Sequence, residues 1–344
     1  MPEEETDTSI SSQKDPSPGN VKAKRTGPAR RKKLSQQESK KPSTAPKERS
    51  VGGPRGAEKK LGDQKLPRKA TSKARKVSDE KTAFEDRARN VKDLIALKAK
   101  RPIVGLTAYD AVLGKLVCDA GADFILVGDS VGTTLLGHKT TIPVDRTDMI
   151  RHTAAVRRAQ PDCLLVADLP FGEASFSFDR LLDSARRLMQ EGGADAVKIE
   201  GGRDVADDIE KLVATGVPVL GHIGLLPQTV KAIGGYRKFG QDQQEAEDLY
   251  TDAIALEEAG CFAVIAEMME AEVARELSKQ ILPPLIGIGS GAGCDGQILV
   301  STDLLGYNVG KPPSFVKTYA NLNQIISKAL SQYVSEVREK KFPG

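Results

Sequence analysis

The chain has 344 residues, enough for one large domain or two ordinary ones, and its formal net charge of +4 conceals an uneven distribution of charge. Residues 1–80 hold 21 Lys/Arg against 11 Asp/Glu, whereas residues 81–344 hold 30 against 36. No apolar run approaches the ~18 residues that a membrane span needs, which excludes a membrane-spanning class. The four cysteines are far apart and only three histidines are present, which disfavours a zinc protein.

The first 80 residues contain no Phe, Tyr, Trp or Cys and few aliphatic side chains. They cannot bury enough apolar surface to offset the entropy lost on ordering. We therefore predict a disordered basic tail over residues 1–80 and a folded domain over residues 81–344. Basic runs such as Arg30–Lys33 would bind nucleic acid or another polyanion through phosphate contacts. The alternative is a solvated extension with no such role.

The chain start is acidic and lacks an apolar segment, which argues against a secretory signal and against a mitochondrial transit peptide. The scattered cysteines are typical of reduced thiols in a cytosolic protein. We therefore expect a cytoplasmic location.

From Lys81 onward, apolar runs alternate with amphipathic stretches. Residues 82–99 show helical spacing. The predicted strands are Ile103–Ala108, Phe124–Gly128, Cys163–Ala167, Ala196–Glu200, Pro218–Gly221, Phe262–Ala266, Pro284–Ile288 and Gln297–Val300. The predicted helices are Ala111–Ala120, Arg146–Arg158, Phe178–Glu191, Val205–Thr215, Gln243–Ala259, Ala271–Gln280 and a last one from about Phe315 to Arg338.

Eight strands alternating with helices predict an α/β fold, the (β/α)₈ TIM barrel. A doubly wound open sheet is the alternative, although no GxGxxG follows the first strand. The connection at 289–296 is too short for a full helix, which is the weakest point of the eightfold pattern.

Charged and polar side chains follow the strands at their C-terminal ends, where a barrel holds its active site. The opposite ends carry little besides loop residues. The residues in question are Asp129, Ser130, Asp168, Lys198, Glu200, His222 and Glu267.

Asp129, Asp168 and Glu200 come from three successive predicted strands. Hard oxygen ligands of this kind suit Mg²⁺. One acidic residue at a strand end often caps the next helix, but three at successive strands indicate a metal site.

Lys198 and Glu200 are two residues apart on one strand, so both side chains point to the same face. Lys198 is either an anchor for a substrate carboxylate, a Schiff-base nucleophile, or only a counter-charge for the acids. The nearby carboxylates keep it charged, which favours the anchor.

Glu267 follows five apolar residues, and a carboxyl group in such surroundings can act as a general base. A salt-bridged loop residue is the alternative. His222 is either a substrate ligand or a structural residue. The glycine-rich segment Ile286–Gly293 resembles the phosphate-binding loops of other barrels, or its glycines simply permit tight turns.

Seven motifs resemble the 3-methyl-2-oxobutanoate (ketopantoate) hydroxymethyltransferase family, in the family's order and spacing, from about residue 90 to the C-terminus. They are LTAYD at Leu106–Asp110, VGDS at Val127–Ser130, ADLPF at Ala167–Phe171, VKIEGG at Val197–Gly202, GHIGLLPQ at Gly221–Gln228, GGY at Gly234–Tyr236 and CDGQILV at Cys294–Val300.

The resemblance implies an enzyme that transfers a hydroxymethyl group from 5,10-methylenetetrahydrofolate to 3-methyl-2-oxobutanoate. The products would be 2-dehydropantoate and tetrahydrofolate, in pantothenate biosynthesis. It further implies a Mg²⁺-dependent barrel that assembles as a homodecamer.

By the same resemblance, the site residues fall into three groups. Asp129, Asp168 and Glu200 would bind the metal; Asp129, Ser130, Asp168 and Lys198 would bind the oxo acid; and Glu267 would accept the proton. The chain departs from the family pattern after Glu267, where Met268-Met269-Glu270 leaves Glu270 as a second candidate for the base, and at Ser290, which replaces a common Ala.

Two other functions fit the same residues. One is a Mg²⁺-dependent aldolase or lyase of the phosphoenolpyruvate/pyruvate barrel group, which would form the same enolate without folate. The other is a non-catalytic relative that its basic tail tethers to nucleic acid. The intact set of acids, together with Lys198 and Glu267, argues against this second function.

Overall fold

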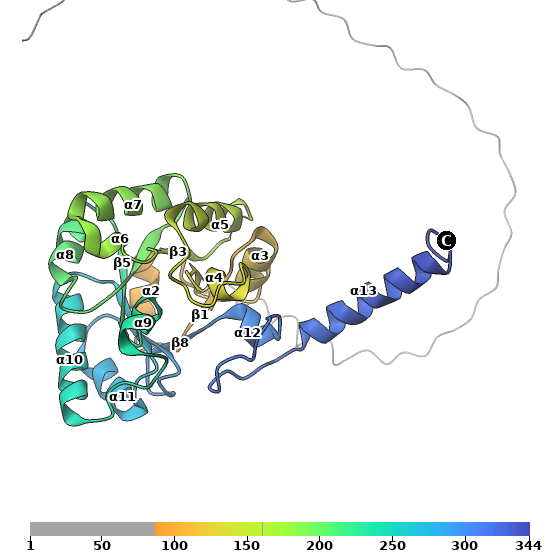
Figure 1. Cartoon of the computed structure of the whole chain (residues 1–344). Coiled ribbons are helices and arrows are strands. Elements are labelled where there is room, and N and C mark those ends of the chain that lie inside the picture. Colours follow the sequence, from red (N-terminus) through yellow and green to blue (C-terminus); the bar gives the residue numbers. More distant parts are fainter. Residues whose placement is uncertain (1–86, 160) are drawn as a thin grey trace, which may run out of the picture. The chain divides into compact units, whose positions relative to one another are not determined.

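The computed structural model describes residues 87–159 and 161–344. Eight parallel strands form a closed barrel in sequence order, and β8 pairs back to β1 (Figure 1). Closure confirms the TIM barrel and rules out the open sheet. The predicted tail at 1–80 and the start of the helical pattern at 82–99 lie outside the described residues. The strands are β1 (Ile103–Thr107), β2 (Phe124–Val127), β3 (Leu164–Asp168), β4 (Ala196–Glu200), β5 (Val219–Gly224), β6 (Ala263–Glu267), β7 (Leu285–Ile288) and β8 (Gly296–Leu299).

The longer helices surround the barrel or close one end of it. They are α2 (Val91–Leu97), α3 (Ala111–Asp119), α5 (Arg146–Arg158), α7 (Phe178–Gln190), α8 (Ala206–Ala214), α10 (Gln243–Glu258) and α11 (Ala271–Gln280). Short turns of helix lie mainly in the loops after the strands: α4 (Val131–Thr134), α6 (Glu173–Phe176), η1 (Pro227–Thr229), α9 (Val230–Ile233) and α12 (Ser301–Leu305). None of these helices in the described part of the chain has the length and apolar character needed to cross a membrane.

Local sequence explains where several helices begin. The side chains of Asp110, Asp145 and Asp242 each accept a hydrogen bond from the backbone N–H three residues later. Such N-caps satisfy an amide that the first turn leaves unpaired. Each of these aspartates therefore ends an extended loop and starts α3, α5 or α10.

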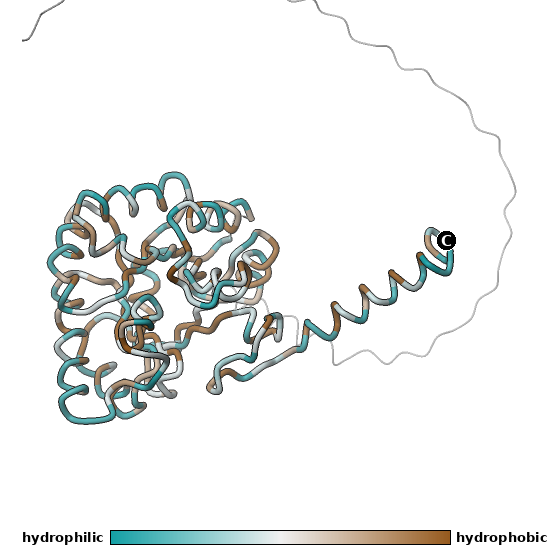
Figure 2. Tube along the Cα trace, viewed as in Figure 1, coloured by the Kyte–Doolittle hydropathy of each residue, from teal (hydrophilic) through white to brown (hydrophobic). Residues whose placement is uncertain are grey.

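The apolar side chains form two layers. An inner layer fills the barrel and includes Ile103, Phe124 and Ile265, while an outer layer lies between the strands and the helices. Leu94 and Leu97 of α2 belong to the inner layer, so α2 closes the N-terminal end of the barrel. Figure 2 shows the apolar residues gathered along the strands and the inner faces of the helices. The barrel interior therefore opens at its C-terminal end.

The last part of the chain agrees with the prediction between β7 and β8 and differs from it at the final helix. In the described structure β7 connects to β8 without a helix, as the short linker suggested. The final helix α13 (Leu322–Arg338) begins seven residues later than the predicted Phe315, because Asn321 provides its N-cap. The helix α13 has no buried residue and extends away from the barrel (Figure 1).

Candidate active site

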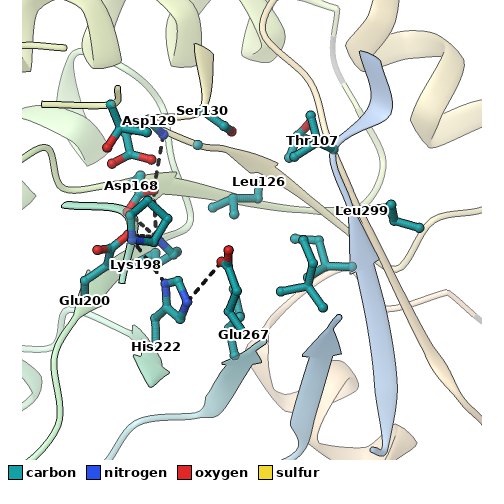
Figure 3. Close-up of a pocket in the computed structure, with 17 residues that line it drawn as sticks. Thr107, Leu126, Asp129, Ser130, Asp168, Lys198, Glu200, His222, Glu267 and Leu299 are labelled. Carbon is teal, nitrogen blue, oxygen red and sulfur yellow. Dashed lines mark hydrogen bonds and ion pairs between the residues drawn. The ribbon is translucent and has the colours of Figure 1, made fainter. Parts of the chain in front are cut away.

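A cavity of about 100 Å³ lies at the C-terminal end of the barrel. All seven polar residues predicted from the strand ends line it: Asp129, Ser130, Asp168, Lys198, Glu200, His222 and Glu267 (Figure 3). They come from β3, β4, β5, β6 and the loop after β2. Parallel strands that all end on one rim place these side chains together, although they are far apart in sequence.

The three predicted metal ligands lie together. Oxygen atoms of Asp129, Asp168 and Glu200 all fall within 4.8 Å of one another. Lys198 donates to both carboxylate oxygens of Asp168 at 2.8 Å and to Glu200 at 3.4 Å. The backbone N–H of Asp129 donates to Asp168 at 3.2 Å. A compact set of carboxylates with one lysine is thus buried at the base of the cavity.

Burial, on balance, opposes the ionisation of two of the three acids, Asp129 and Asp168. Burial, followed by the neighbouring carboxylates Asp168 and Glu200, raises the pKa of Asp129 well above its ordinary value. Burial likewise raises the pKa of Asp168, although Lys198 acts against it. Burial alone would lower the pKa of Lys198, but Asp168, Glu200 and Asp129 outweigh that effect and raise it. Lys198 therefore stays an ammonium group, which favours an electrostatic anchor over a Schiff-base nucleophile.

His222 lies between two carboxylates. Its Nε2 is 3.3 Å from Glu267 and its Nδ1 is 3.6 Å from Glu200, both at ion-pair distance without good hydrogen-bond geometry. Burial and Lys198 lower the pKa of His222, but Glu200 and Glu267 outweigh them and raise it to about 9. A protonated His222 thus links the acidic cluster to Glu267.

The charges around the cavity test whether a divalent cation fits. Full ionisation of Asp129, Asp168, Glu200 and Glu267 would set four negative charges against the ammonium of Lys198 and the imidazolium of His222. Two negative charges would then be uncompensated in a buried site, which is costly unless a cation is present. The clustered oxygens of Asp129, Asp168 and Glu200 therefore fit Mg²⁺ both in charge and in donor chemistry.

Gln228 is a site residue for which the sequence patterns predict no role. Its Nε2 donates to Asp129 at 3.0 Å and to the Leu169 carbonyl at 2.9 Å, and its backbone N–H donates to Glu200 at 3.1 Å. It lies in the short helix η1 after β5, which folds over the acidic cluster. The only signal in the sequence is its place in the GHIGLLPQ motif.

Three hydroxyl-bearing residues also line the cavity. Ser130 lies 2.9 Å from the phenol oxygen of the buried Tyr109, which orients its hydroxyl group. Thr107 accepts from the backbone N–H of Ser301 at 3.0 Å. The buried hydroxyl of Thr141 has no hydrogen-bond partner among the described residues. Ser130 was predicted, whereas Thr107 and Thr141 were not.

Glu267 ends β6 and its carboxyl group points into the cavity (Figure 3). Ser290 fixes the backbone on both sides of it, since its hydroxyl accepts from the Met269 N–H and donates to the Ala266 carbonyl. The second candidate for the base, Glu270, does not line this cavity and pairs with Lys238 at 3.3 Å. The geometry thus favours Glu267 over Glu270 as the candidate base, and Ser290 holds the backbone around it.

The glycine-rich segment after β7 is closely packed. A Cβ atom on Gly289 would lie 2.8 Å from the Met268 sulfur, and one on Gly291 would lie 2.6 Å from the Ala271 side chain. Both glycines also have positive φ angles. This favours the interpretation that these glycines permit tight turns, and the predicted phosphate loop stays untested.

Comparison with known proteins gives the same family as the motifs. A family model described as ketopantoate hydroxymethyltransferase matches residues 88–344. The chain belongs to the ketopantoate hydroxymethyltransferase family. The 3-methyl-2-oxobutanoate hydroxymethyltransferase of Halalkalibacterium halodurans is 49% identical over 244 residues, covering 71% of this chain and 88% of that protein. The enzyme of that name from Thermus thermophilus is 48% identical over 256 residues, covering 74% and 97%.

Among solved structures, a 2,3-dimethylmalate lyase of the PEP mutase/isocitrate lyase superfamily is 16% identical, with a TM-score of 0.49 over 74% of this chain and 89% of its own. This likeness is too distant to bear on the reaction. The family model and the relatives therefore decide between the two enzymes considered above. They confirm the hydroxymethyltransferase and give no support to an aldolase or lyase.

Proposed function

We propose that the chain transfers the hydroxymethyl group of 5,10-methylenetetrahydrofolate to C3 of 3-methyl-2-oxobutanoate, giving 2-dehydropantoate for pantothenate synthesis. One observation carries the proposal: a candidate base, Glu267, faces an acidic metal-type cluster and a charged lysine across one small cavity. A reaction that creates an enolate next to a carboxylate needs these three elements.

The cavity suits a small branched 2-oxo acid. Lys198 and Ser130 supply a cation and a hydroxyl group for its carboxylate and keto oxygens. The rest of the wall is largely apolar, with Leu126, Ile265 and Ile288 positioned to contact an isopropyl group. A substrate held in this way presents its polar end to the acidic cluster and its C3 carbon to the other wall.

Asp129, Asp168 and Glu200 would hold Mg²⁺, which would supply Lewis-acid stabilisation of developing negative charge. Glu267 accepts the C3 proton, and the ammonium of Lys198 stabilises the negative charge that develops on the substrate oxygens. His222, beside Glu267, holds the carboxylate in place and offsets its charge. The C3 carbon then forms a bond with the one-carbon unit, both C–N bonds that join this unit to the folate break, and one water supplies the hydroxyl oxygen. The C3 proton and one proton of the water end on the two folate nitrogens, which gives tetrahydrofolate.

Hydrogen exchange at C3 tests the proposal. The full chain with Mg²⁺ should exchange the C3 proton of 3-methyl-2-oxobutanoate with deuterated solvent in the absence of folate, and should form 2-dehydropantoate only when methylenetetrahydrofolate is added. Nuclear magnetic resonance follows both events. Loss of the C3 signal with neither Mg²⁺ dependence nor folate-dependent product would refute the proposal. Equal product formation from formaldehyde without folate would instead favour the aldolase.

We also propose that the chain works as a homo-oligomer, for which the predicted number of subunits is ten. Apolar side chains of α13, among them Leu330 and Tyr333, are exposed. Val104 on the outer face of β1 is also 44% exposed, and so is Val112 on α3 at 72%. The helix after the last strand of a barrel normally covers this wall. Burying both apolar surfaces between copies would explain them, and analytical ultracentrifugation should detect a multimer that is lost on deleting residues 322–344.

Two further proposals rest on the composition of the chain. We infer a cytoplasmic location, which the four free cysteines support. We also infer that the basic tail binds polyanions weakly, and heparin-column retention of the full chain compared with residues 81–344 tests this.

A further inference from the structure

A second cavity, of about 550 Å³, adjoins the catalytic one. Glu267 lines both, so the two spaces meet at the candidate base. The catalytic cavity, at about 100 Å³, has room for a small oxo acid but not for a folate as well. A cavity of a few hundred cubic ångströms is the size that binds a drug-sized ligand.

The walls of the second cavity combine flat apolar surfaces with a few polar groups. Tyr236 comes from the loop after α9, and Phe315 from the segment between α12 and α13. Both present aromatic surface on which a planar ring can stack. Val309 and Pro313 add aliphatic surface. The chemistry of this lining suits a planar heteroaromatic ligand.

Besides Glu267, the carboxylate of Asp303 lines this cavity. It is half-buried in α12, and one of its oxygens accepts a hydrogen bond from the side-chain amide of Asn308 at 3.0 Å. The other oxygen, Oδ2, has no hydrogen-bond partner among the described residues, and because Asp303 lines the cavity its carboxylate can accept from a ligand there. Burial raises the pKa of Asp303, although Asn308 acts against this. A half-buried carboxylate of this kind gains most from a ligand with paired N–H donors.

Lys311 provides a positive charge on the same lining. Its side chain is exposed and forms no ion pair with any residue in the described part of the chain. It therefore suits an anionic group at the open side of the cavity, while Asp303 suits donors.

We propose that the second cavity binds 5,10-methylenetetrahydrofolate, with Asp303 accepting from the N3–H and 2-amino groups of the pterin and Lys311 pairing with the glutamate carboxylates. This inference rests on the proposed function, since only a folate-dependent transfer needs a second site here. The one-carbon unit then lies at the boundary of the two cavities, next to Glu267 and the C3 carbon of the oxo acid. Tyr236 and Phe315 line the space for the pterin and the aminobenzoyl ring.

Asp303→Asn tests the pterin contact, because it keeps the shape and the bond to Asn308 but weakens the acceptor. The KM for methylenetetrahydrofolate and the Kd for tetrahydrofolate, measured by calorimetry, should both rise at least about tenfold. Folate-independent C3 exchange serves as the internal reference for a folded catalytic site. An unchanged KM with normal exchange would overturn this inference alone. Absence of exchange in the unmodified enzyme would overturn the proposed function as well.

Lys311→Gln tests the charge contact, with Lys317→Gln as its matched control. Lys317 is six residues further on, its ammonium group lies 4.7 Å from the Tyr319 ring centroid, and it does not line the cavity. Lys311→Gln should raise the KM for a glutamylated folate about threefold to tenfold, and leave the KM for the pteroate analogue without glutamate unchanged. Equal effects of both substitutions, or equal effects on both folates, would overturn the assignment of Lys311.

Discussion

Acidic residues lie at both ends of this barrel, but the acids at the two ends differ in the number of cations that pair with them. At the N-terminal end, Asp123 is fully buried just before β2. Arg101 donates to both of its oxygens, at 2.7 and 2.8 Å, and the backbone N–H groups of Ala88 and Val104 donate to it as well. This carboxylate has a full set of partners within the chain.

Two more aspartates at the N-terminal end follow the same arrangement. Asp195, before β4, pairs with Arg157 at 2.7 Å and accepts from the Leu165 N–H at 2.9 Å. Asp295, before β8, pairs with Lys98 at 3.2 Å and accepts from the Leu285 N–H at 2.9 Å. Each acid has its own cation and an amide of a neighbouring strand. The prediction that this end carries little besides loop residues was therefore wrong, and its acids join the strands together.

At the C-terminal end, by contrast, Asp129, Asp168 and Glu200 share a single lysine. Burial raises the pKa of Asp129 and of Asp168 there. The comparison contrasts acids that each have a cation of their own with acids that share one. The first kind joins the strands together, and the second kind is the set that we propose to bind a metal ion.

The largest effect should come from removing the base at the C-terminal end. Glu267→Gln keeps the size of the side chain but cannot accept a proton, so C3 exchange should fall at least about a hundredfold. Calorimetry should still detect Mg²⁺ binding. Glu270→Gln, which removes the charge three residues away and outside the catalytic cavity, should exchange at the normal rate. If the rate of C3 exchange fell in Glu270→Gln and stayed normal in Glu267→Gln, Glu270 would be the base instead of Glu267.

Removing a metal ligand should be the next largest effect. Mg²⁺ at about 100 times its Kd should stabilise the protein by about 2.7 kcal/mol, since it binds only the folded state. Asp129→Asn should abolish this gain, whereas Asp123→Asn should keep it, because only the C-terminal acids lack cations of their own. Thermal unfolding with EDTA and with Mg²⁺ measures both. If Mg²⁺ stabilised both variants equally, the acids at the two ends of the barrel would not differ in Mg²⁺ binding.

A moderate effect on stability should appear at the N-terminal end. Asp123→Asn takes the charge from a buried acceptor of four hydrogen bonds, which should lower the free energy of unfolding by about 2 kcal/mol. The kcat should stay unchanged because the residue lies at the far end of the barrel from the cavity. Urea unfolding together with steady-state kinetics provides the check. Lower kcat with unchanged stability would mean that the two ends are coupled.

The smallest effect should come from residues 2–80, which lie outside the described part of the chain. Deleting residues 2–80 should change kcat and KM by less than about twofold, because the seven predicted site residues all lie beyond residue 128. Steady-state assays of the full and shortened chains test this. A large loss of turnover would assign the tail a part in catalysis.

The sequence alone determined the fold class and much of the site. Strand periodicity predicted all eight strands of the barrel, and the charged residue after each strand predicted Asp129, Asp168, Glu200 and Glu267. The spacing of Lys198 and Glu200 predicted a shared face, and Lys198 contacts Glu200 in the structure. These features were accessible because strand geometry is local and repeats every two residues.

Only the tertiary structure decided which acids pair with a cation of their own, and that a second cavity adjoins the site. Gln228 contacts Asp129 across 99 positions of sequence. The partners of Asp123 and the second cavity around Asp303 likewise join segments that are distant in the chain. No local pattern encodes such contacts, because they depend on which loops the closed barrel brings to each rim. The charge balance that separates the two ends of the barrel is therefore a property of the fold.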